Sequence, residues 1–374
     1  MTIPWIEIVE ARDQEIPAGP GSSEYVWQAM VACLVGIPSH QEWSKLKWGW
    51  NVAALFDEAM ERQKLFLESQ YYVRTDGNLE SPDRRTLAFR FINLPGEGLL
   101  VSVLGKIHGR SQEEARECAL AYFTELKSTF PYDYVLIPAE SRQEFLEISG
   151  SGLLEYDQAE PVQVKRVELP FQPNGNSPFL QGFWHSSSRA HEPIWRMLAA
   201  SSTPLLLNVS LRSTILFEKD RERLLVSADE ISNKQDGFIN QKTLDTMKQW
   251  NRDFVERRLH PWKKFFYLQV HLVSPGNIEA NLSRIIGASL TMSATGASQP
   301  GYRVINPGKN HGPSWRKKIR NLEPIFSGSF LSAPRLSEIA DLDEVFAVMR
   351  LPYSPPDNGL PGVKFWTGLH KDAS

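Results

Sequence analysis

TLAFRFINLPGEGLLVSVLGKI, residues Thr86–Ile107, is the stretch that decides the fold class of this chain. Two apolar runs, Thr86–Ile92 and Leu99–Ile107, flank the turn sequence Leu94–Gly98. Proline and glycine between two runs rich in β-branched and aromatic residues are typical of a β-hairpin. We therefore predict that two strands pair here.

A helix and a third strand are predicted to follow this hairpin. Ser111 and Glu114 have the spacing of a capping box, which indicates that a helix begins there. The residues expected on its buried side are Ala115, Cys118, Ala119, Tyr122 and Leu126. The run Tyr132–Ile137 then has the pattern of a strand, which Pro138 ends.

The same order of strand, capped helix, strand and proline occurs again at 264–307. Here the strands are predicted at Lys264–Val273 and Tyr302–Ile305, with a helix that Asn277 caps between them. Two split βαβ (ferredoxin-like) layers would explain both copies. We expect an α+β protein with two domains, residues 1–150 and 151–335, because glycine, serine and proline are dense after residue 149.

Further elements are expected between these units. Helices are predicted from Ser22 or Ser23 to about Gly36, and at 52–67, 193–200 and 241–259, and strands at 1–10, 162–169 and 205–216.

Composition bounds the class of protein. With 374 residues, 41% hydrophobic and 23% charged, the chain is typical of an ordinary globular protein. A formal net charge of −3 argues against bulk attraction to nucleic acid or to an anionic membrane. Two cysteines cannot make a disulfide framework, and the N-terminus lacks the pattern of a signal peptide, so we expect a cytoplasmic protein that does not enter a membrane.

The C-terminal region, residues 336–374, is predicted to be a helix followed by an arm rich in proline and glycine. An apolar stripe of helical spacing runs from Ile339 to Met349, and Pro352, Pro355 and Pro361 then prevent further helix. The arm must therefore lie against something.

A family resemblance is found in this region. Arg350-Leu351-Pro352 after a short acidic helix, and an arm that ends Leu360-Pro361-Gly362, resemble the segment that joins an N-terminal α+β region to the ATPase core in HerA/FtsK-like and conjugative type IV secretion ATPases. The resemblance implies a layered α+β front region, here encoded apart from the ATPase core, and a DNA-pumping ATPase as partner.

Two Gly-Lys pairs are the parts of the sequence that come nearest to a phosphate-binding loop. Neither Gly105-Lys106 nor Gly308-Lys309 has the first glycine or the following serine or threonine of a phosphate loop. We expect no catalytic residues, no cofactor and no metal. The alternative from another class is a metal-dependent nuclease that uses Glu218, Asp220 and His191.

Two basic patches are candidates for contact with nucleic acid. The first surrounds a helix end and contains Arg252, Arg257, Arg258, Lys263 and Lys264. The second contains Lys309, Trp315, Arg316, Lys317, Lys318 and Arg320. Clustered Lys and Arg can contact phosphates, although a solvated surface explains such patches as well. We expect a basic turn in the second patch, with its glycine-flanked tryptophan outside the core.

From these observations we expect a non-catalytic scaffold or regulatory subunit whose partner is a HerA/FtsK-like ATPase, in conjugation or phage defence. A free-standing nucleic-acid-binding protein is a further alternative. The residues expected to bind the partner are Arg350, Pro352, Tyr353, Pro361 and Trp366.

Overall fold

The computed structural model describes most of the chain. The described residues are 3–10, 27–38, 52–76, 79–82, 85–170, 179–187, 189–233, 241–276, 278, 280–293, 300–308, 310–326, 335–353, 360, 362–363 and 365–366.

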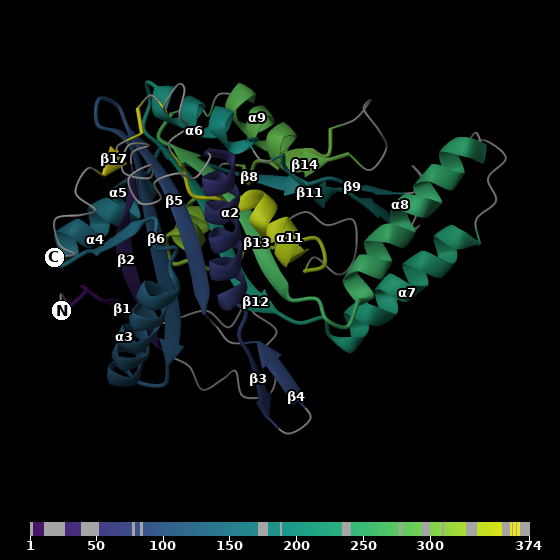
Figure 1. The fold of residues 1–374 in the computed structure, drawn as a ribbon, viewed down its shortest axis with the longest axis horizontal. Coiled ribbons are helices and arrows are strands. Elements are labelled where there is room, and N and C mark those ends of the chain that lie inside the picture. The colour runs from purple at the N-terminus through teal and green to yellow at the C-terminus, as the bar shows by residue number, and fades with distance from the viewer. Residues whose placement is uncertain are drawn as a thin grey trace.

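One large sheet dominates the described part of the molecule (Figure 1). Its strands follow the order β1-β2-β6-β5-β12-β13-β8-β15, and every pairing along this path is antiparallel. β16 pairs with β13, while β7 and β17 pair with β2. These strands are β1 (Glu7–Glu10), β2 (Trp27–Pro38), β5 (Thr86–Leu94), β6 (Gly98–Gly109), β7 (Val135–Pro138), β8 (Glu160–Arg166), β12 (Leu205–Thr214), β13 (Phe265–Ser274), β15 (Tyr302–Ile305), β16 (Ile339–Asp341) and β17 (Phe365–Trp366).

Helices and short two-stranded ribbons surround this sheet. The ribbons are formed by β3 (Val73–Asp76) with β4 (Leu79–Pro82), β9 (Glu168–Pro170) with β10 (Phe179–Gln181), and β11 (Phe183–Trp184) with β14 (Thr291–Met292). The helices are α2 (Val52–Ser69), α3 (Gln112–Thr129), α4 (Arg142–Ser149), α5 (Ser151–Glu155), α6 (His191–Ala200), α7 (Glu218–Ser232), α8 (Gln241–Leu259), α9 (Ala280–Leu290), α10 (Gly312–Arg320) and α11 (Leu342–Val348). Among the described residues, no helix combines the length and apolarity that crossing a bilayer requires.

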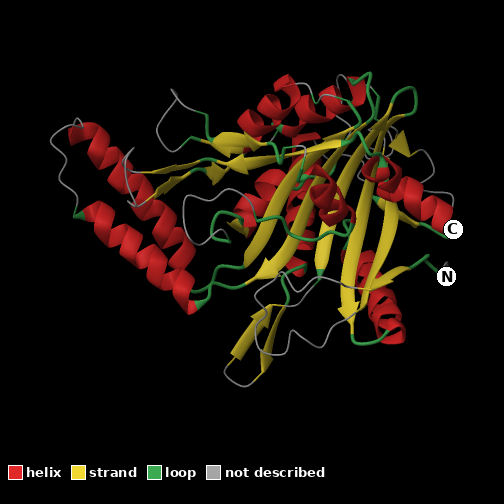
Figure 2. Ribbon diagram, turned by 180° about the vertical axis from the view of Figure 1, so that it is seen from behind, coloured by secondary structure: helices red, strands yellow, loops and turns green. Residues whose placement is uncertain are grey.

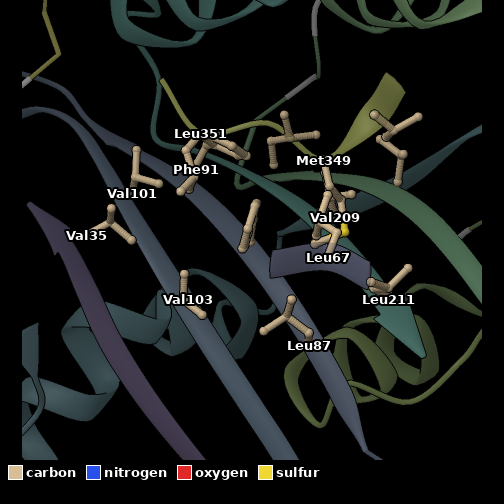
Figure 3. Close-up of a cluster of buried hydrophobic side chains, with 14 of the residues drawn as sticks. Val35, Leu67, Leu87, Phe91, Val101, Val103, Val209, Leu211, Met349 and Leu351 are labelled. Carbon is tan, nitrogen blue, oxygen red and sulfur yellow. The ribbon is translucent and has the colours of Figure 1, made fainter. Parts of the chain in front are cut away.

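One face of the sheet carries the main hydrophobic core. Side chains alternate along a strand, so that Leu87 and Phe91 of β5 lie on the same face as Val209 of β12. Helices α2, α3, α6, α9 and α11 cover this face (Figure 1). Figure 3 shows that Met349 and Leu351, from the end of the chain, join this cluster.

The opposite face of the sheet carries buried polar side chains beside two smaller hydrophobic clusters. Arg90 has no exposed surface, and its guanidinium donates to Asn208 Oδ1 at 2.9 Å, to Ser149 O at 2.6 Å and to Ile319 O at 2.6 Å. These two carbonyls belong to the last turns of α4 and α10, where a helix carries partial negative charge. Arg90 therefore fastens both helices to the sheet, and burial lowers its pKa to about 9.

The expected fold class, α+β, is confirmed, but the two ferredoxin-like layers are not. β5 pairs with β12 from Asn93↔Leu205 to Thr86↔Arg212, so strands from both sides of residue 150 share one sheet. Figure 2, seen from behind, shows this sheet as a single curved surface. The division into domains at residues 150 and 335 stays a prediction.

Most predicted elements are confirmed, among them the hairpin β5–β6, the helix that Ser111 caps and the helix α8. The helix expected up to Gly36 is wrong, because Trp27–Pro38 is a strand. β2 is buried on both faces, and a continuous apolar run of this kind has no period that separates strand from helix.

The C-terminal helix begins later than predicted. Ile339–Asp341 is a strand beside β13, and the helix α11 starts only at Leu342, after a capping box between Asp341 and Glu344. The basic turn expected near Arg316 is the helix α10 instead. Its first turn contains Pro313, which is well tolerated at that position.

The helices α7 and α8 form a hairpin that projects from the body of the molecule (Figure 1, right). Phe254 and Val255 of α8 and Leu224 of α7 pack in a small core cluster at the base of this hairpin. On the outer side of α7, Leu225 and Val226 are exposed.

Candidate functional site

The described residues of the C-terminal arm lie against the same chain. Tyr353 is buried, its hydroxyl bonds to Glu192, and its ring meets those of Trp195 and Phe56 edge to face at 5.7 and 4.8 Å. Pro352 is buried as well. Pro352 and Tyr353 are thus part of the core of this chain. They could contact a partner only if the segment that contains them left the core.

The other residues expected to bind a partner are placed as follows. Arg350 is buried and donates to Phe346 O at 3.0 Å and to Ser187 O at 3.1 Å. Trp366 lies in β17, where its backbone is paired with Pro38 of β2. Pro361 is outside the described residues.

A buried charge network holds the segment before this arm. Glu344 of α11 lies 2.7 Å from Arg166 of β8 and 2.5 Å from Arg258 of α8, and all three side chains are almost fully buried. Asp341 contacts Arg257 and Arg258. Burial acts to raise the pKa of Asp341, but the hydrogen bond from Arg257 and the charges of both arginines outweigh it, so this pKa is lower than its ordinary value.

The basic patch expected to contact nucleic acid is only partly at the surface. Trp315 is buried and packs edge to face on His271 at 6.0 Å, so the expectation that it lies outside the core is wrong. Arg316 is also buried and donates to Asp157 O at 2.7 Å and to Ala159 O at 2.9 Å.

The remaining members of this patch differ in exposure. Lys317 is exposed, Lys318 is half-buried, and Arg320 forms an ion pair with Glu155 at 2.8 Å. Lys309 is outside the described residues. Contact with nucleic acid stays a prediction, and the described members of the patch that are exposed or half-buried are Lys317, Lys318 and Arg320.

Of the residues of the nuclease alternative, Glu218 and Asp220 lie on α7, whereas His191 lies on α6. Asp220 of α7 pairs with Arg335 at 2.8 Å and accepts from Phe217 N at 3.0 Å. His191 of α6 bonds through Nε2 to Val348 O at 3.0 Å. No group of three or more His, Cys, Asp or Glu side chains in the described part of the chain is arranged to hold a metal ion.

The surface feature least explained by packing is Trp262. Its side chain is 86% exposed, in the turn that follows α8. Charged pairs surround the turn, because Lys263 lies 3.3 Å from Asp343 and Lys264 lies 2.6 Å from Glu68. We call these five residues the Trp262 surface.

Trp262 is absent from the predicted site residues, although Lys263 and Lys264 beside it belong to the first basic patch. The signal was present, since Pro261 ends the helix and puts the next residue in a turn, where a large apolar side chain has few neighbours. An exposed tryptophan with a polar rim has the anatomy of an interface anchor.

Comparison with known protein families found no family model that matches the chain, and no curated protein matches it either.

Proposed function

We propose that this chain is a non-catalytic scaffold or regulatory subunit of a larger assembly and works in the cytoplasm. Its proposed partner is a HerA/FtsK-like, DNA-translocating ATPase, in conjugation or phage defence. The observation that carries the proposal of a partner is the 86% exposure of Trp262. The class of partner rests on the sequence resemblance of residues 350–362.

The Trp262 surface supports a protein partner on energetic grounds. Tryptophan is enriched among the few interface residues whose truncation costs about 2 kcal/mol or more. The ion pairs of Lys263 and Lys264 around it are exposed enough to contribute little to folding. They provide a polar rim that can exclude water around a docked indole ring.

The α7–α8 hairpin extends this candidate interface. It projects from the body (Figure 1), and its second helix ends at Leu259, shortly before Trp262. Leu225 and Val226 are about half exposed on α7, at 51% and 54%. A partner that docks on the hairpin would thus meet further apolar surface besides the indole ring.

The test is association of the purified chain with a HerA/FtsK-like ATPase, to be sought in the neighbouring reading frame, measured by light scattering after size exclusion. Trp262→Ala should weaken binding at least ~30-fold, as expected for a hot-spot residue. Tyr156→Ala is the matched control, because Tyr156 is an aromatic residue with 53% exposure far from this turn in sequence. Equal binding by both variants and the parent would remove Trp262 from the interface.

A second assay separates this proposal from the alternatives. The chain is incubated with DNA and magnesium or manganese, and cleavage that Glu218→Ala abolishes would favour a nuclease. A free-standing nucleic-acid-binding protein would instead bind DNA with an affinity that falls steeply with salt and with Lys317→Ala plus Lys318→Ala.

A further inference from the structure

A row of polar side chains crosses four neighbouring strands on the face of the sheet that carries Arg90. Lys106 of β6 is paired with Thr86 of β5, Thr86 with Arg212 of β12, and Arg212 with Tyr267 of β13. Directly paired residues of adjacent antiparallel strands lie about 5 Å apart and point to the same face. Thr86 is therefore placed between two basic residues in this row, and all four residues are buried.

A small pocket opens beside this row. Thr86, Ser210, Arg212, Tyr267, Gln269 and Leu322 line it together with Leu211 and Pro324. It has about 10 Å³ of space into which a water molecule fits, far less than the ~300 Å³ or more that a small organic substrate needs. Its size suits a single water molecule or a monoatomic ion.

The polar atoms around this pocket favour an acceptor as its occupant. Thr86 Oγ1 is buried and has no hydrogen-bond partner among the described residues. The Tyr267 hydroxyl accepts from Arg335 Nε at 2.8 Å, so its own proton is available for donation. Both amide atoms of Gln269 are taken by the backbone of Ile325.

Charge around the pocket points to an anion rather than to water. Arg212 lines the pocket, whereas Lys106 is the strand partner of Thr86 and does not line it. The charge of Arg335, which contacts Tyr267, is offset by an ion pair with Asp220 at 2.8 Å, so the cation among the described lining residues is Arg212. A cation among these groups would be repelled, whereas an anion would receive hydrogen bonds that ionised donors strengthen.

The pocket wall contains the one residue other than glycine with a positive φ in the described chain. Leu322, at φ 52°, follows the C-terminus of α10, and its side chain is buried in a cluster with Leu104 and Phe145. The left-handed backbone costs about 1 kcal/mol or more for such a residue. This backbone conformation is stabilised by the hydrogen bond from Leu322 N to Ile319 O at 3.2 Å and by the burial of the Leu322 side chain, which lines the pocket.

We propose that this pocket binds one anion of halide size, with chloride as the abundant candidate, through Thr86, Tyr267 and Arg212. The site joins the strands β5, β12 and β13 to the segment after α10. Its occupation stabilises the folded chain and is independent of the proposed partner.

The test is the midpoint of thermal unfolding of the full chain in sodium chloride and in sodium gluconate at equal ionic strength. Chloride at about ten times its Kd should raise the midpoint by ~2 °C, with saturation. Thr86→Val keeps the shape but removes the hydroxyl, and should weaken chloride binding ~10-fold. Ser102→Ala is the matched control, because Ser102 Oγ is buried on the same face and has no hydrogen-bond partner among the described residues, but does not line the pocket.

A second measurement does not depend on the folding of any variant. Crystals of the parent chain grown in bromide should show an anomalous peak beside Thr86 and Tyr267. A midpoint that is the same in chloride and in gluconate, or a bromide-grown crystal with only water in the pocket, would overturn the anion site.

Discussion

Arg166 and Glu344 form an ion pair at 2.7 Å although neither side chain has any exposed surface. They are far apart in the sequence, and the pair joins β8 to α11. Arg258 makes a second contact with the same carboxylate, so one anion holds two buried cations.

Glu344→Gln should lower the free energy of unfolding by about 3–5 kcal/mol, because it leaves Arg166 and Arg258 buried without the charge that compensates them. Urea denaturation measures this change. Asp343→Asn is the control on the same helix, since Asp343 is 53% exposed and its ion pairs should contribute no more than about 1 kcal/mol. An equal loss of unfolding free energy in both variants would contradict the view that burial makes the Glu344 ion pairs more important than those of Asp343.

Arg90→Met should destabilise the chain by about 2–4 kcal/mol, because the carbonyls of Ser149 and Ile319 would then lie buried without their donor. Hydrogen exchange should locate the effect in α4 and α10, which Arg90 fastens to the sheet. Arg142→Met, at an exposed arginine of α4, is the comparison and should leave exchange unchanged. Loss of protection elsewhere only would argue against this role of Arg90.

Two buried histidines should make the chain sensitive to acid. Burial lowers the pKa of His191, with a contribution from Arg350, and that of His271 to about 3 each, from an ordinary value of 6.5. Between pH 6.5 and 3 the unfolded chain therefore binds protons that the folded chain does not, so stability falls as the pH falls. Each histidine should contribute a loss of about 2 kcal/mol between pH 6.5 and 5.

Urea denaturation at these two pH values checks this dependence. His271→Leu should reduce the difference in free energy between them, whereas His260→Leu, at an exposed histidine, should not. An unchanged pH dependence in His271→Leu would contradict a neutral, buried imidazole at that position.

Cys33 should not react with a thiol reagent in the folded protein at pH 8. Burial raises the pKa of its thiol to about 12, against the weaker opposing charge of Lys127, so the thiolate that reacts is scarce. Ellman's reagent should label only the half-buried Cys118 in the native chain and both thiols in denaturant. Rapid native labelling that Cys33→Ala removes would show that β2 opens.

The elements with local signals could be predicted from the sequence. The proline and glycines between β5 and β6 indicate the turn of a hairpin. Ser111 indicates the start of α3, and its hydroxyl accepts from Glu114 N at 3.1 Å. β2 has no such signal, since an apolar run buried on both sides is compatible with either periodicity. Its identity is decided by pairing with β6, which is remote in sequence.

The candidate site was harder to predict because burial depends on tertiary contacts. Arg316 and Trp315 have the composition of a basic surface, yet they lie on the buried side of α10, where Trp315 packs on His271 of the sheet and Arg316 bonds to the loop after α5. Trp262 is the opposite case. Pro261 places it in a turn after α8, but an indole ring beside charged residues gives no sequence sign of how exposed it is. Composition alone does not distinguish these two tryptophans.

The last described segment completes the core that the first third of the chain begins. Leu351 N donates to Gln63 Oε1 at 2.9 Å, and Leu99 N donates to Gly362 O at 2.7 Å. During synthesis the apolar face of the earlier strands therefore stays incompletely covered until residues 335–363 have left the ribosome. Nascent chains stalled before this point should be bound by chaperones and remain open to proteases.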